Sequence, residues 1–128
     1  MAIDVHEELG IDELRRRLLE HTRRFYRMLR LPDRPQVLDI GCGRGLPTVE
    51  LARLSGGRIV GIDTDDEALS LLRRRVEKEG LTTQVTVLLR SLYETGLGNE
   101  SFDLLWEEGV LHLLENSKSF RECNRLLK

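Results

Sequence analysis

The 128-residue sequence has little of what marks several classes of protein. Its two cysteines, Cys42 and Cys123, fit no metal-ligand or redox spacing, so we expect reduced thiols and no metal site. Aromatic residues make up 5% of the chain, too few for a surface on which bases stack. The 20 basic and 22 acidic residues nearly cancel, which also disfavours a nucleic-acid partner.

Long apolar stretches are absent as well. No run approaches the roughly 20 residues that a membrane-spanning helix needs, and the first residues do not follow a secretion-signal pattern. The sequence therefore predicts a cytoplasmic protein with no membrane partner. Its length fits one domain with a substantial core.

Apolar segments of two lengths alternate along the chain. The patterns predict helices over 12–30, 46–54 and about 66–79, with a last helix from 116 or 117, and strands over 36–40, 58–62, 84–89 and 102–106. This alternation predicts an α/β fold, a parallel sheet with helices on both faces. The chain then divides into an N-terminal helical segment, 1–35, and a sheet-containing domain, 36–128.

The helix predicted over 12–30 has Asp12 as its candidate N-cap. An apolar stripe runs along it, made of Leu14, Leu18, Phe25 and Leu29. Its many arginines, interleaved with Glu13 and Glu20, predict a solvated face. Contact with an acidic substrate or RNA is the alternative for these arginines. They are Arg15, Arg16, Arg17, Arg23, Arg24, Arg27 and Arg30, with Arg34 just beyond the helix.

The nonapeptide VLDIGCGRG, residues 37–45, places three glycines at alternate positions directly after an apolar strand. Such a turn lets the backbone approach a nucleotide. Eighteen residues after Gly45 a second apolar strand runs into Asp63, which can accept hydrogen bonds from ribose hydroxyls. The spacing G-x-G-x-G differs from the dinucleotide pattern, whose third glycine would fall at Leu46. Asp39 would repel a pyrophosphate and attract an ammonium or sulfonium group.

VLDIGCGRG followed by GIDTDDEAL resembles the S-adenosylmethionine-dependent methyltransferases of the class I Rossmann-like fold, especially their small-molecule group. The resemblance covers residues 36–128. It implies strand order 3-2-1-4, S-adenosylmethionine as cofactor with S-adenosylhomocysteine as product, and in-line methyl transfer to a small-molecule acceptor.

The resemblance also implies which residues bind the cofactor. The glycine turn, Gly41, Cys42, Gly43 and Gly45, would contact the methionine portion, and Asp39 would orient that turn near the amino group. Asp63 would bind the ribose hydroxyls, with Thr64 beside the adenine. Ser91 and Leu92 would hold the adenine, although many family members have an aspartate where Ser91 stands. Glu107 completes this set.

The segment after the fourth strand supplies the candidate catalytic residues. Glu108 is the first candidate for contacting an acceptor amine or hydroxyl, followed by Glu107 and then His112. A general base is needed only when the acceptor loses a proton as it attacks. The simpler alternative is that these carboxylates cap the loop or form ion pairs.

Members of the resembling family usually have further strands after the fourth, so we expect a sheet truncated before strand 5. Its fourth strand, bearing Phe102, Leu104, Leu105 and Trp106, would then lie at an open edge, which favours self-association. Two other functions stay open: a non-catalytic module that binds S-adenosylmethionine or S-adenosylhomocysteine, and an NAD-dependent oxidoreductase. Asp39 and the glycine spacing disfavour the oxidoreductase.

Overall fold

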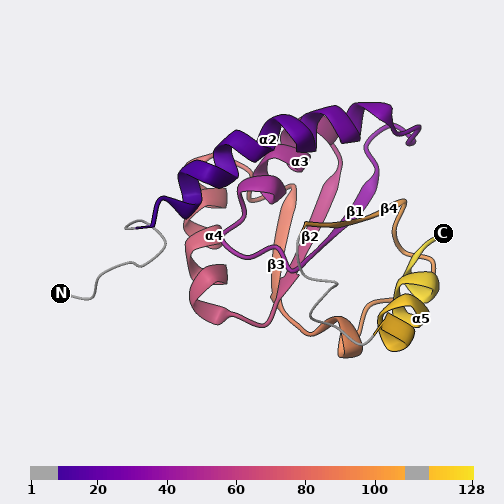
Figure 1. The fold of residues 1–128 in the computed structure, drawn as a ribbon. Coiled ribbons are helices and arrows are strands. Elements are labelled where there is room, and N and C mark those ends of the chain that lie inside the picture. The colour runs from indigo at the N-terminus through magenta and orange to yellow at the C-terminus, as the bar shows by residue number, and fades with distance from the viewer. Residues whose placement is uncertain (1–8, 109–115) are drawn as a thin grey trace.

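A computed structural model describes residues 9–108 and 116–128, and Figure 1 shows its arrangement. The helices are α2 (Ile11–Met28), α3 (Leu46–Ser55), α4 (Asp66–Lys78), α5 (Asn116–Leu126) and the short 3-10 helix η1 (Leu92–Glu94). The strands are β1 (Gln36–Ile40), β2 (Arg58–Asp63), β3 (Val85–Leu89) and β4 (Leu104–Glu107). Within these described ranges no helix is long and apolar enough to cross a membrane.

The strands form one parallel sheet of order β3-β2-β1-β4, which confirms the predicted fold class and strand order. Ile40 of β1 lies opposite Ile62 of β2 and Glu107 of β4. The carboxyl ends of these three strands therefore meet at one edge of the sheet, where ligands bind in open α/β sheets.

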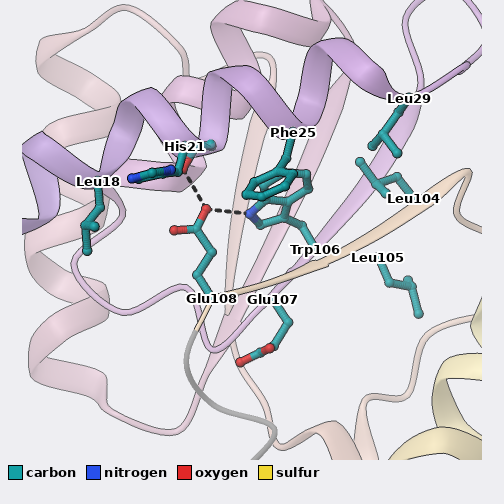
Figure 2. A pocket seen from close by; sticks show the side chains of 10 residues that line it. Leu18, His21, Phe25, Leu29, Leu104, Leu105, Trp106, Glu107 and Glu108 are labelled. Carbon is teal, nitrogen blue, oxygen red and sulfur yellow. Dashed lines mark hydrogen bonds between the residues drawn. The ribbon is translucent and has the colours of Figure 1, made fainter.

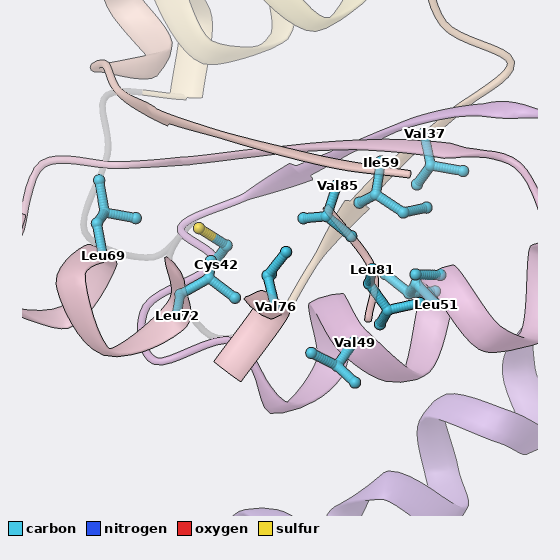
Figure 3. Close-up of a cluster of buried hydrophobic side chains, with 11 residues drawn as sticks. Val37, Cys42, Val49, Leu51, Ile59, Leu69, Leu72, Val76, Leu81 and Val85 are labelled. Carbon is cyan, nitrogen blue, oxygen red and sulfur yellow. The ribbon is translucent and has the colours of Figure 1, made fainter. Parts of the chain in front are cut away.

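Helices cover both faces of the sheet (Figure 1), as expected. Val37 packs under α3 and α4, whereas its neighbour Leu38 packs toward η1 and α5, because successive strand side chains point to opposite faces. The first cluster, drawn in Figure 3, includes Leu51, Ile59, Leu69, Leu72 and Val76. The second includes Ile40, Ile62, Leu92, Phe102 and Leu126.

The predicted starts of two elements are wrong, and α2 ends at Met28, two residues before its predicted end. Helix α2 begins at Ile11 after Gly10, whose φ of 64° is left-handed and which provides no side-chain cap, so Asp12 is not the N-cap. Strand β4 begins at Leu104, two residues later than predicted. The Asp103 carboxylate accepts the Gln36 N–H at 2.8 Å in place of a backbone carbonyl, and Phe102 instead forms an isolated bridge with Leu127.

The apolar stripe predicted on α2 faces outward. Leu14, Leu18, Phe25 and Leu29 are 41–57% exposed, whereas a neighbouring stripe, Arg15, Leu19, Thr22 and Tyr26, faces the rest of the molecule. Helix α2 lies along α3 (Figure 1), and Arg23 Nε donates to Oε1 of the buried Glu50 on α3 at 2.6 Å. This ion pair fixes the orientation of α2, and in that orientation α3 does not cover the apolar stripe.

Three residues of the exposed stripe, Leu18, Phe25 and Leu29, line a groove of about 510 Å³ together with Leu104, Leu105 and Trp106 of β4. Strand β4 is one of the two edge strands of the described sheet, with β3 at the other edge. Self-association through the β4 edge stays a prediction. Light scattering over a range of protein concentrations checks it, and a strictly monomeric chain would contradict it.

Gly45 at the start of α3 is packed against Leu72 of α4. Its φ is 85°, and a methyl group on its Cα would lie 2.0 Å from Leu72 Cδ1 and 2.9 Å from Leu72 Cγ. We expect Gly45→Ala to lower the free energy of unfolding by about 2–5 kcal/mol, because backbone strain and overpacking add. Chemical denaturation measures this.

Gly56→Ala is the matched control. Gly56 also has a left-handed φ, 61°, but a methyl group there meets nothing within 4 Å. Gly56→Ala should lower the free energy of unfolding only through backbone strain, by about 1–2 kcal/mol. Equal losses for the two variants would show that the contact between Gly45 and Leu72 does not matter.

Candidate functional site

The glycine turn begins where β1 ends. Gly41, Gly43 and Gly45 have φ of 67°, 52° and 85°, left-handed values that other residues adopt only with strain. The amides of Gly41 and Cys42 both donate to Ile62 O, at 2.8 and 3.0 Å. The sequence therefore forms a tight turn that is held against the end of β2.

Asp63, the last residue of β2, joins this turn to the start of α4. Its Oδ2 accepts the Gly43 N–H at 2.8 Å, and its Oδ1 accepts the Asp65 N–H at 2.9 Å. Asp65 in turn caps α4, since its Oδ1 accepts the Ala68 N–H at 3.1 Å. A carboxylate has about four acceptor positions, so Asp63 can accept hydroxyl donors as well.

Asp39 on β1 lies beneath the turn and is 3% exposed. Its Oδ2 accepts a hydrogen bond from Thr48 Oγ1 of α3 at 2.7 Å. Burial raises the pKa of Asp39 from 3.8 to about 7, Thr48 opposes this rise, and the charges of Glu108 and Asp63 add to it. The carboxylate thus orients the strand and the helix on either side of the turn. Its predicted position near an amino group stays a prediction.

Glu107 is the last residue of β4, and Glu108 follows it directly. Oε1 of Glu108 accepts hydrogen bonds from Thr22 Oγ1 of α2 and from Trp106 Nε1, both at 2.7 Å (Figure 2). Glu107 pairs with Ile40 in the sheet register. The charges of Glu107, Glu108 and Asp63 all act on Asp39, so the fold brings the four predicted acids together. His112 lies outside the described residues.

The remaining predicted residues differ in their surroundings. Thr64 is exposed directly after Asp63, and Ser91 Oγ accepts the Tyr93 N–H at 3.2 Å as the cap of η1. Leu92 is 5% exposed and packs in the second core cluster. Its side chain therefore serves first in the hydrophobic core, and the predicted contact with adenine would be additional. Cys42 is buried, and burial raises the pKa of its thiol. Their cofactor contacts stay predictions.

Sequence reasoning missed Arg15, which it assigned to the solvated arginine face. Arg15 is half-buried on the inward stripe of α2. A methyl group on the Gly43 Cα would lie 3.8 Å from Arg15 Nη1 and 3.9 Å from Asp63 Oδ2. The available signal was spacing, because Arg15 and Thr22 are seven residues apart and share one helix face.

A parallel sheet with a glycine turn after one strand and an acid after the next defines a nucleotide-binding α/β domain. Comparison with known families identifies the family. Residues 37–128 match the model described as "Methyltransferase domain", and the chain belongs to this family.

Three relatives show how much of the chain is shared. It is 32% identical over 108 residues to Methyltransferase GfsG of Streptomyces halstedii, which covers 84% of this chain and 39% of that one. It is 41% identical over 85 residues to the "Probable cobalt-precorrin-6B C(15)-methyltransferase (decarboxylating)" of Saccharolobus solfataricus, covering 63% of this chain and 42% of that one.

The crystal structure of a SAM-dependent methyltransferase from Aquifex aeolicus superposes with a TM-score of 0.77 at 26% identity. The match covers 84% of this chain and 58% of that one. The chain therefore spans less than two thirds of the length of each of these three relatives.

The raised pKa of Asp39, about 7 against 3.8, has a consequence for stability. Folding favours the protonated carboxyl, so the stabilising contribution is present below pH 3.8 and is lost as pH rises to about 7. The side chain of Asp39→Asn stays neutral, so the variant does not lose this stabilising contribution as pH rises. Relative to the natural chain, we expect the variant to gain up to about 1.4 kcal/mol per pH unit across this range.

Denaturant titrations of both proteins between pH 4.5 and about 8 measure this difference. The exposed Asp33→Asn is the control and should follow the pH profile of the natural chain. A constant difference between Asp39→Asn and the natural chain at every pH would contradict the prediction.

Proposed function

We propose that this chain binds S-adenosylmethionine and that the protein transfers its methyl group to a small-molecule acceptor. The observation that carries this proposal is the joining of Gly43 to the Asp63 carboxylate, which sets a glycine turn beside an acceptor of ribose hydrogen bonds. Membership of the methyltransferase domain family supports it, as does the 26% identical SAM-dependent methyltransferase of Aquifex aeolicus.

The charges of the site favour this cofactor over NAD. Asp39, Asp63, Glu107 and Glu108 lie at or near the carboxyl ends of β1, β2 and β4, and the pKa of Asp39 is raised by burial and by the charges of the other three. Such a site attracts the sulfonium and ammonium groups of S-adenosylmethionine and repels a pyrophosphate. In this arrangement Asp63 binds the ribose, and Thr64, Ser91 and Leu92 lie on the adenine side.

In the proposed reaction a lone pair on the acceptor attacks the methyl carbon as the carbon–sulfur bond breaks. The bonding electrons pass to sulfur, which leaves S-adenosylhomocysteine, and alignment supplies much of the rate. Glu108 is the candidate for contacting the acceptor, and Glu107 is the second. Because Thr22 and Trp106 already donate to Oε1 of Glu108, this carboxylate is held in place for contact with an acceptor amine or hydroxyl.

The acceptor class is supported by relatives. The relative from Saccharolobus solfataricus is named as a methyltransferase of a cobalt-precorrin, a small molecule. The cytoplasmic location predicted from the sequence stays a prediction.

Calorimetry tests cofactor binding. S-adenosylmethionine and S-adenosylhomocysteine should bind and NAD should not. We expect Asp63→Ala to weaken binding about tenfold or more, because ribose hydrogen bonds to a charged acceptor are lost. Asp66→Ala, at the exposed first residue of α4, should bind as the natural chain does. Circular dichroism verifies that both variants fold. Tight NAD binding would reject the proposal in favour of an oxidoreductase.

A second experiment separates an enzyme from a binding module. Production of S-adenosylhomocysteine is measured with amine, hydroxyl and thiol acceptors. The module is the second candidate because the chain covers 39% of its relative from Streptomyces halstedii. Cofactor binding without turnover for any acceptor would favour the module.

A further inference from the structure

The α2–β4 groove, which lies between helix α2 and strand β4, has apolar side chains along both sides (Figure 2). Leu18, Phe25 and Leu29 line it from the helix and are 41–56% exposed. The strand contributes Leu104, Leu105 and Trp106. Its volume of about 510 Å³ is typical of small-molecule sites. Exposed apolar side chains that gather in one hollow of this size indicate a binding surface.

The dimensions of the two elements set the shape of an occupant. Leu18 and Phe25 are about 10 Å apart along the axis of α2, at about 1.5 Å per residue. Leu104 and Glu107 are also about 10 Å apart along β4, at about 3.3 Å per residue. A ligand that fills the groove therefore has an elongated apolar portion.

One end of the groove is acidic. Glu107 and Glu108 line it where β4 ends. Oε1 of Glu108 accepts hydrogen bonds from Thr22 and Trp106, and among the described residues none donates to its Oε2. Two donors on one oxygen hold the carboxylate in a fixed direction, with the second oxygen available. A positively charged group complements this end.

The acidic end also adjoins the proposed cofactor site. Glu107 lies opposite Ile40 in the sheet, and the glycine turn begins at the next residue, Gly41. The charges of Glu107 and Glu108 both act on Asp39 beneath that turn. A ligand whose cationic group meets Glu108 would therefore have this group beside the glycine turn and its apolar portion along β4.

We propose that the α2–β4 groove binds the apolar portion of the methyl acceptor, whose amine meets Glu108, an inference that rests on the proposed function. The acceptor class is then an amphipathic amine with an apolar portion about 10 Å long. An acceptor with a phosphate or carboxylate at this end would be repelled by Glu107 and Glu108. Leu18 and Phe25 make the N-terminal helix a determinant of acceptor specificity, although the family match begins only at residue 37.

Trp106 provides a direct measurement, because it lines the groove and is the only tryptophan of the sequence. Its fluorescence is followed while n-butylamine, n-hexylamine and n-octylamine are titrated in the presence of S-adenosylhomocysteine. We expect each added CH₂ group to tighten binding about two- to fourfold, because each buries more apolar surface. The uncharged 1-octanol should bind about tenfold more weakly than n-octylamine, because it lacks the charge-assisted bond.

Two variants separate the apolar wall from the acidic end. Leu18→Gln should weaken n-octylamine about threefold or more, because apolar contact is lost. Leu14→Gln is its matched control, since Leu14 is exposed one turn earlier on α2 and does not line the groove. Glu108→Gln keeps an acceptor for Thr22 and Trp106 but loses the charge, so it should abolish the preference for n-octylamine over 1-octanol. The exposed Glu67→Gln, with the same change in net charge, should keep that preference.

Equal affinity for the three amines would overturn the inference, and so would unchanged binding of n-octylamine by Leu18→Gln. Trp106 emission that shifts with protein concentration alone, without binding of n-octylamine, would show that a second copy fills the groove instead. Calorimetry with S-adenosylhomocysteine distinguishes the two proposals. A chain that does not bind it rejects the proposed function, whereas a chain that binds it but not n-octylamine rejects only the inference about the groove.

Discussion

The hydrogen bond from the Gly43 amide to the Asp63 carboxylate connects the ends of two neighbouring strands. It joins Gly43, which has a left-handed φ of 52°, to the acid that ends β2. The same carboxylate accepts the Asp65 amide, and Asp65 caps α4. One side chain therefore sets the shape of the turn and the start of the helix that packs beside it.

The acids of the site have different structural roles. Asp39 is buried, bonded to Thr48 and raised in pKa, so it serves mainly to hold β1 against α3. Glu108 is more exposed and receives two donors from different elements, which connects α2 to the edge strand. Similar carboxylates thus differ in role, since the buried one holds two elements together and the exposed one keeps a side open to solvent.

The parallel sheet and the glycine turn were predictable from the sequence because apolar periodicity and glycine spacing are local signals, whereas the strand order was implied by the family resemblance. The side of α2 that faces inward was not predictable from the sequence. Hydrophobicity favoured Leu14 and Leu18, whereas the orientation is fixed by Glu50 and Glu108, which are distant in sequence. The start of β4 was also missed, because the Asp103 side chain substitutes for a backbone acceptor. Both errors arise from polar side chains acting over long separations.

The bond between Thr22 and Glu108 spans 86 residues of chain, which gives the N-terminal helix an unusual place in the order of assembly. A ribosome adding 5–20 residues per second reaches Glu108 roughly 4–17 s after Thr22. Until then α2 can rely on its contacts with α3, including the ion pair with Glu50. Helix α2 precedes the sheet in the chain, yet it is fully secured only after β4 has been synthesised. The arrangement of Arg15 over the turn is completed only when the edge strand has joined the sheet.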